Sequence, residues 1–148
     1  MQTPLLDPNM FESLSLRKEV VLEREEALRI EIRELDDSDK KRFHEKFSLA
    51  VKDPDTYAVL NFFFVAGLHH FYLAKILRGT INLVVFAIGV ISLFLNAIGF
   101  GALLIGVILL IELPALFRAQ LIVGHYNNEL SSELLEQIKS DNLGLIER

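Results

Sequence analysis

The side chains most able to do chemistry lie in the apolar middle of the sequence. His69 and His70 are adjacent, and Glu112 stands inside a long apolar run. Imidazole nitrogens and carboxylate oxygens bind transition metals such as zinc, and a carboxylate inside a membrane can carry protons. Adjacent positions on a helix point about 100° apart, so the two imidazole rings are not expected to face one ligand. We therefore predict no metal ligands and no cofactor.

Glu112 is predicted to tie helices together. A carboxylate in an apolar segment is costly, so it normally faces other helices and has a partner there. The candidate partners are Lys75, Arg78 or a histidine, and the alternative is a protonated carboxyl group. Three asparagines of the same region can form hydrogen bonds between helices: Asn61, Asn82 and Asn96. The competing hypothesis is a proton or ion pathway that uses Glu112 and these asparagines.

Other familiar reaction chemistry is missing from the sequence. The chain has no cysteine, which removes disulfides and thiolate nucleophiles. Gly99 and Gly101 have no phosphate-binding context around them, and no serine has a base arranged beside it. We expect no enzyme activity and identify no small-molecule substrate.

Formal charge is distributed very unevenly along the chain. Between residues 55 and 118 the only charged side chains are Lys75, Arg78 and Glu112. This contrast is typical of a membrane core with polar flanks. The net charge is −5 and no basic block is present, which argues against nucleic acid as a partner. The first residues lack both a basic and a long apolar segment, so we expect no cleavable signal peptide.

The apolar region is predicted to be all-α. A first span is expected over residues 56–77. Residues 80–117 are too long for one straight helix across a bilayer, and 96–101 (NAIGFG) hold the only turn chemistry. The expected fold is either three short transmembrane helices or a helical hairpin. Four glycines are expected to let these helices approach closely: Gly89, Gly99, Gly101 and Gly106.

Both flanks are predicted to be amphipathic helices. Within residues 11–35 an apolar side chain recurs every seven residues: Leu14, Val21, Leu28 and Leu35. A strand pair is the alternative, because the apolar residues 28, 30 and 32 alternate with charged ones. After a break at 36–38, a second helix over 39–51 places Phe43 and Phe47 on one face. The tail, 119–140, carries a third apolar stripe: Leu130, Leu134, Leu135 and Ile138.

Basic residues beside the first span predict the orientation. Four of them cover the helix over 39–51: Lys40, Lys41, Arg42 and Lys46. A basic amphipathic helix before a span can lie on anionic headgroups, or it can be a solvated helix that packs against a partner. The excess of Lys and Arg on this side predicts a cytoplasmic N-terminus in the inner membrane. Three spans would place the tail on the opposite side, and two would return it.

One stretch resembles the core of the TM-two domain family. Residues 67–73 (GLHHFYL), followed by Lys75 and 79–83 (GTINL), are similar to its Gly-x-(His or Asp)-Arg-Phe-Tyr-Leu-Gly motif and the start of its next helix. His70 stands where that family has Arg, and Ala74 where it has Gly. Residues 106–112 (GVILLIE) resemble its second element, with Glu112 in place of Asp. The matching motif residues are Gly67, His69, His70, Phe71, Tyr72, Leu73, Lys75 and Gly79.

The resemblance covers roughly residues 55–117 and implies a small helical membrane domain of bacterial type, without enzyme chemistry or cofactor. We expect three regions: a cytoplasmic N-terminal region (1–54), a TM-two-like membrane domain (55–118) and an amphipathic tail (119–148). The expected function is that of a non-enzymatic adaptor or accessory subunit in the lipid bilayer, bound to other membrane subunits or to itself. The alternative is a small oligomeric channel or transporter.

Overall fold

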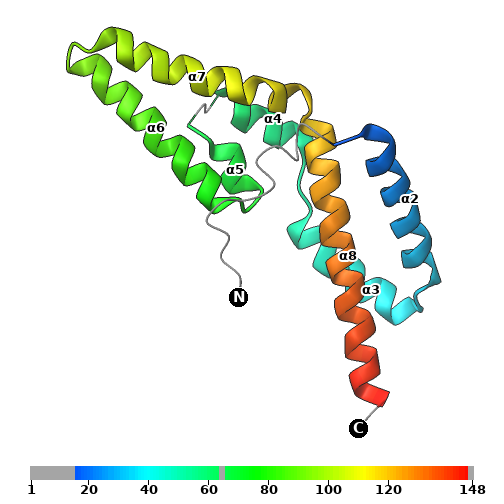
Figure 1. Cartoon of the computed structure of the whole chain (residues 1–148). Helices are drawn as coiled ribbons and strands as arrows, with labels where there is room; N and C mark the ends of the chain where they lie inside the picture. The colour runs from blue at the N-terminus through cyan, green and yellow to red at the C-terminus, as the bar shows by residue number, and fades with distance from the viewer. Residues whose placement is uncertain (1–15, 64–65, 147–148) are drawn as a thin grey trace. The chain divides into compact units, whose positions relative to one another are not determined.

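The computed structural model describes residues 16–63 and 66–146, and every regular element in them is an α-helix (Figure 1). The all-α prediction is confirmed for this part of the chain. The helices are α2 (Lys18–Glu34), α3 (Asp37–Ala50), α4 (Pro54–Phe63), α5 (Leu68–Tyr72), α6 (Ile76–Phe94), α7 (Ile98–Phe117) and α8 (Ala119–Ile146). They form two compact units. We call Asp53–Val123 the hairpin unit, and Leu16–Lys52 together with the described part of Gly124–Arg148 the flank unit.

The flank unit is built from α2, α3 and the larger part of α8. Its core combines side chains from all three helices: Leu28, Phe43, Leu134, Leu135 and Ile138. The stripe predicted from the seven-residue repeat is confirmed, because Val21 and Leu28 are buried and Leu35 packs against the core. The strand alternative is wrong, and Leu14 lies outside the described residues. The flanks predicted as residues 1–54 and 119–148 thus contribute to one core.

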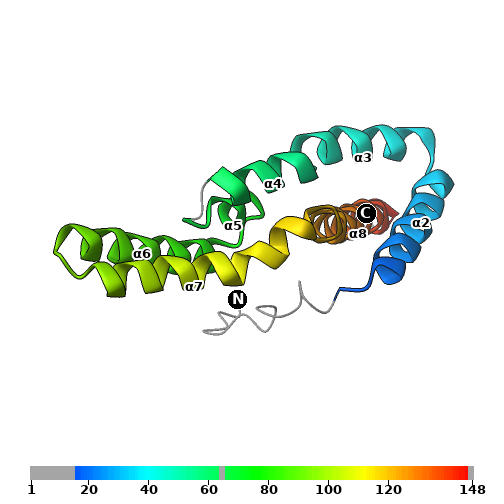
Figure 2. The same ribbon diagram turned by 90° about the horizontal axis from the view of Figure 1, so that it is seen from above.

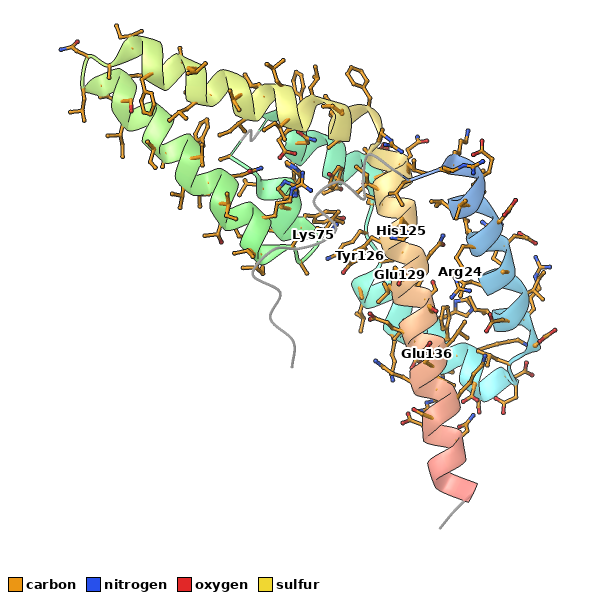
Figure 3. All side chains as sticks on the ribbon, viewed as in Figure 1. Arg24, Lys75, His125, Tyr126, Glu129 and Glu136 are labelled. Atoms are coloured by element: carbon orange, nitrogen blue, oxygen red, sulfur yellow. The ribbon has the colours of Figure 1, made fainter. Side chains whose placement is uncertain are left out.

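Polar contacts also join α8 to the N-terminal helices. Arg24 of α2 points toward α8 (Figure 3), and its Nη2 donates to Ser132 Oγ at 2.8 Å. The Nδ2 of Asn128, a buried residue, donates to the Val21 carbonyl oxygen at 2.9 Å. Asn127 bonds both the N–H and the carbonyl of Lys52, each at 2.9 Å. These contacts link α8 to α2 and to the residue that follows the C-cap of α3, within the flank unit.

Two aspartates lie at the starts of helices. Asp36 accepts a hydrogen bond from the Asp39 backbone N–H at 2.8 Å, and Asp53 accepts one from Thr56 at 2.6 Å. Each bond satisfies a donor in the first helical turn. Hydrogen bonds to the ionised carboxylates, first from those backbone groups and then from the side chains of Ser38 and Thr56, hold the pKa of both aspartates below the ordinary value of 3.8.

In the hairpin unit, α6 and α7 run side by side in both views of the ribbon (Figures 1 and 2). The chain reverses at Asn96, whose φ of 60° lies in the left-handed region that asparagine tolerates better than most residues. The turn predicted over 96–101 is confirmed in place but is shorter, because α7 already begins at Ile98.

Two of the four predicted close-packing glycines lie where α6 meets α7. A Cβ at Gly101 would come 2.6 Å from the Gly89 carbonyl oxygen, and one at Gly89 would come 2.9 Å from Ile105 Cγ1. The prediction is wrong for Gly99 and Gly106, since a Cβ at either would meet no atom within 4 Å. Those two lie elsewhere on α7, away from the contact with α6.

Among the described residues, two helices are long and apolar enough to cross a membrane: α6 and α7. They leave many apolar side chains exposed, including Phe94, Leu110 and Phe117. A water-soluble protein rarely exposes so much apolar surface, whereas a lipid bilayer covers it. The length and composition of both helices are therefore consistent with a membrane hairpin.

The expected first span over residues 56–77 is wrong as a single helix. The helix α4 ends at Phe63, and Gly67, with φ 87°, precedes the five-residue α5. Ala74, with φ 57°, then turns the chain into α6. A ten-residue helix such as α4 is about 15 Å long, half the thickness of a bilayer core. Of the two expected arrangements, the helical hairpin matches the candidate spans.

Candidate functional site

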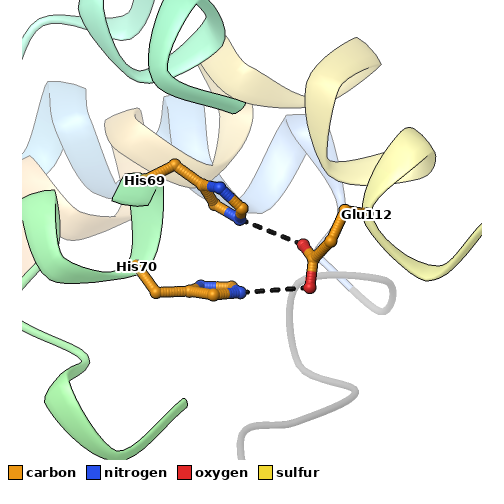
Figure 4. A group of neighbouring side chains, drawn as sticks. All are labelled: His69, His70 and Glu112. Atoms are coloured by element: carbon orange, nitrogen blue, oxygen red, sulfur yellow. Dashed lines mark hydrogen bonds and ion pairs between the residues drawn. The ribbon is translucent and has the colours of Figure 1, made fainter. Parts of the chain in front are cut away.

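A buried cluster joins α5 to α7. The Nε2 atoms of His69 and His70 lie 3.0 and 3.1 Å from the two carboxylate oxygens of Glu112 (Figure 4). The side chains are almost fully buried: 0% of His69, 4% of His70 and 3% of Glu112 is exposed. When Glu112 is ionised its carboxylate only accepts hydrogen bonds, and each imidazole then donates its Nε2–H to it. The site thus holds two donors on one acceptor group.

The expectation that two adjacent histidines cannot face one partner is wrong. It considered only the direction in which each side chain leaves the helix, whereas rotation within the side chains brings the ring tips together. The ring centroids of His69 and His70 lie 4.0 Å apart, with a tilt of 47°. The carboxylate of Glu112 also offers two oxygen atoms, so the rings do not compete for one position.

The carboxylate of Glu112 has further partners on α6. Asn82 Nδ2 donates to Oε1 at 2.7 Å, and Arg78 Nη2 lies 3.9 Å from the same oxygen. Asn61 of α4 donates to the backbone carbonyl of Glu112 at 3.3 Å. Four helices therefore meet at this one residue. The predicted role of Glu112 as a tie between helices agrees with this geometry, and its partners include two of the expected kinds, an arginine and a histidine.

Two polar residues of the apolar region lie apart from the cluster. Asn96 is exposed at the turn between α6 and α7, where it shapes the backbone. Lys75 precedes α6 (Figure 3) and is not among the described partners of Glu112. Of the three asparagines expected along a proton or ion pathway, only Asn61 and Asn82 reach Glu112.

The remaining motif residues hold α5 in place. Gly67 lies against Asn82, where an added Cβ would come 2.7 Å from the asparagine Cβ. Gly79 was expected at the start of a helix. It lies inside α6, which begins three residues earlier at Ile76, and it faces the ring of Phe71. Tyr72 accepts a hydrogen bond from the Asp53 backbone N–H at 2.8 Å, and Leu73 is buried.

Tyr57 is the residue of the site that the sequence analysis did not identify. It is 2% exposed, and its ring meets that of His69 edge-on at 5.2 Å between centroids. The available signal was a polar aromatic residue at the start of an apolar run. Through this contact Tyr57 limits the movement of the His69 ring, because aromatic pairs favour such edge-to-face geometry.

The predicted membrane-surface residues of α3 pair with acidic neighbours. Lys40 lies 3.8 Å from Asp37, and Lys41 lies 4.0 Å from Glu45. Arg42 bridges Asp39 and Asp141 at 3.3 and 2.8 Å, so it faces α8 within the flank unit. Lys46 is exposed. Such exposed ion pairs are weak, so the lysines can still bind lipid headgroups.

Comparison of the chain with protein-family models, with curated proteins and with solved structures found no match.

Proposed function

We propose that this chain is a non-enzymatic integral membrane protein that acts as an adaptor or accessory subunit. In this proposal α6 and α7 cross the inner membrane, and the flank unit binds another subunit on the cytoplasmic side. The resemblance to the TM-two domain family is part of the proposal and stays a prediction.

The proposed topology rests on one observation, namely which helices make up the flank unit. The helices α2 and α3 precede the hairpin and α8 follows it, yet all three share one core. Segments that pack together must lie on the same side of a membrane. The chain between them then crosses the membrane an even number of times, which fits the two candidate spans. The basic residues of α3 favour the cytoplasm for that side.

The outer face of α2 supports the adaptor role. Val20, Leu22 and Ile30 are each about half exposed. At 100° per residue, Ile30 lies opposite the buried Val21 and Leu28, and Val20 and Leu22 lie on the two flanking sides of α2. Apolar side chains on the water-facing part of a membrane protein are typical of surfaces that bind a partner. We place the subunit contact on the side of α2 that is centred on Ile30.

Cysteine accessibility tests the topology, and the absence of native cysteine makes it direct. Ser48→Cys on α3 and Ser140→Cys on α8 should react with a membrane-impermeant maleimide only after spheroplasts are lysed. Ala97→Cys at the hairpin turn should react in intact spheroplasts. All three positions are exposed. Labelling of Ser48→Cys and Ser140→Cys from opposite sides would exclude the even number of crossings.

Purification from native membranes tests the adaptor role. We expect the chain to carry a stoichiometric partner, and Ile30→Glu to lower its recovery by about tenfold, as a change of about 1.4 kcal/mol at an interface does. Gln137→Glu adds the same carboxylate at an exposed position of α8 and should leave the partner bound. A wild-type chain that purifies alone from these membranes would contradict the proposal.

An oligomeric channel or transporter is the alternative function, and the contacts of Asn61 and Asn82 with Glu112 are what favours it. This alternative predicts ion or proton flux into liposomes that contain the purified chain. The flux should be lost in Glu112→Gln.

A further inference from the structure

We propose that His69, His70 and Glu112 form a binding site for one divalent transition-metal ion of the zinc class. The inference is independent of the adaptor role. Two imidazole nitrogens and one carboxylate are a donor set that zinc accepts in proteins, with a fourth position left for water or another ligand. Nitrogen donors disfavour calcium and magnesium, which bind oxygen ligands.

The spacing of the donor atoms suits an ion. One candidate ligand atom from each residue lies within 4.8 Å of the others. Ligands at about 2.0–2.1 Å from a tetrahedral zinc ion are about 3.3 Å from each other. The distances from His69 and His70 to Glu112 are 3.0 and 3.1 Å. An ion therefore needs only a small outward movement of the three side chains, with each neutral imidazole moving its proton from Nε2 to Nδ1 so that Nε2 is free to bind the metal.

The surroundings already hold the ligands in position. Asn82 fixes one carboxylate oxygen of Glu112, and Asn61 fixes its backbone carbonyl. Tyr57 lies edge-on against the ring of His69. Loss of a group that orients a metal ligand in this way typically lowers metal affinity about 10- to 100-fold. The ion would cross-link α5 to α7 through residues that lie more than forty positions apart in the sequence.

Substitution of Arg78 tests the proposal, because it should raise the metal affinity and not lower it. Its guanidinium lies 3.9 Å from Glu112 Oε1, so it attracts the carboxylate and repels a cation bound there. If the cluster binds metal, Arg78→Gln strengthens that binding. If the cluster is only a hydrogen-bonded tie between helices, the same change removes one favourable ion pair and leaves metal binding absent.

The experiment uses the full chain, purified in detergent with an affinity tag that contains no histidine. We expect about one zinc ion per chain by elemental analysis, and a rise in melting temperature when Zn²⁺ is added to chelator-treated protein. His70→Gln and Glu112→Gln should abolish both effects. Asn82→Ala should weaken the affinity about 10- to 100-fold, and Arg78→Gln should strengthen it. His44→Gln is the matched control, since His44 is exposed on α3, and should bind zinc like wild type.

Circular dichroism and gel filtration establish that each variant is folded. A folded wild-type chain that holds no ion and shows no change of melting temperature with Zn²⁺ or Co²⁺ overturns the proposal, whether or not the variants fold. Equal loss of zinc from His44→Gln and His70→Gln overturns it too, because the binding would then be adventitious. A visible Co²⁺ spectrum of a four-coordinate site, absent in His70→Gln, supports it.

Discussion

Replacing Glu112 by alanine is expected to lower the free energy of unfolding of the hairpin unit by about 3 kcal/mol. The substitution removes the acceptor for His69, His70 and Asn82 together, and it removes the carboxylate that lies 3.9 Å from Arg78. Hydrogen bonds between membrane helices average only about 0.6 kcal/mol each, so three of them explain about 2 kcal/mol. The rest comes from the lost attraction between the Glu112 carboxylate and the Arg78 guanidinium. Unfolding by sodium dodecyl sulfate in mixed micelles measures the change.

Glu112→Gln is the matched comparison. Glutamine keeps the length and an acceptor oxygen, and a neutral imidazole can change tautomer to accept from the new amide. We expect a loss of about 1 kcal/mol, close to that of one hydrogen bond. Equal losses for alanine and glutamine would show that the negative charge, and not the set of acceptors, stabilises the cluster. Wild-type stability in Glu112→Ala would show that the cluster does not hold α5 to α7.

Gly101→Ala is expected to destabilise the helical hairpin, by about 1–3 kcal/mol. The added methyl group would come 2.6 Å from the Gly89 carbonyl oxygen, and it would also touch Leu93 at 2.9 Å. The carbonyl belongs to the backbone of α6 and cannot rotate away, so the two helices must separate. Separation weakens the packing along their length, because membrane helices associate through close contact.

Gly106→Ala is the control on the same helix, and its effect should have the opposite sign. A Cβ at Gly106 meets no atom within 4 Å. Alanine also favours helix over glycine by up to about 1 kcal/mol, so the variant should be as stable as wild type or slightly more stable. The same unfolding titration measures both variants. Equal destabilisation at the two glycines would contradict the packing of α6 on α7.

The flanks show what apolar periodicity is able to predict. The repeat through Val21, Leu28 and Leu35 and the stripe through Leu134 and Ile138 each identified a helix and its buried face. Those patterns are local, since side chains a helical turn or two apart share a face in any helix. Such local patterns do not predict which apolar stripes pack against each other. The shared core of the two flanks is a long-range contact, and it became visible only in the folded chain.

The error over residues 56–77 has a related cause. An apolar run predicts burial or lipid contact. The same composition is compatible with one continuous helix or with two short helices. The break depends on Gly67, whose left-handed φ is available to glycine but not required by it. Its close approach to Asn82 of α6 is a tertiary contact that favours the bend. A sequence-based count of spans does not include such a contact.

By itself, the sequence predicted the helical class, the turn near Asn96 between two apolar segments, and Glu112 as a tie between helices, because each depends on composition or on neighbours in the chain. Only the tertiary structure decided that His69 and His70 share the carboxylate of Glu112, more than forty residues away. Which side chains meet there depends on backbone bends and on side-chain rotation. Neither is encoded by spacing along the chain, so the cluster that could bind a metal emerges only after α5 is folded against α7.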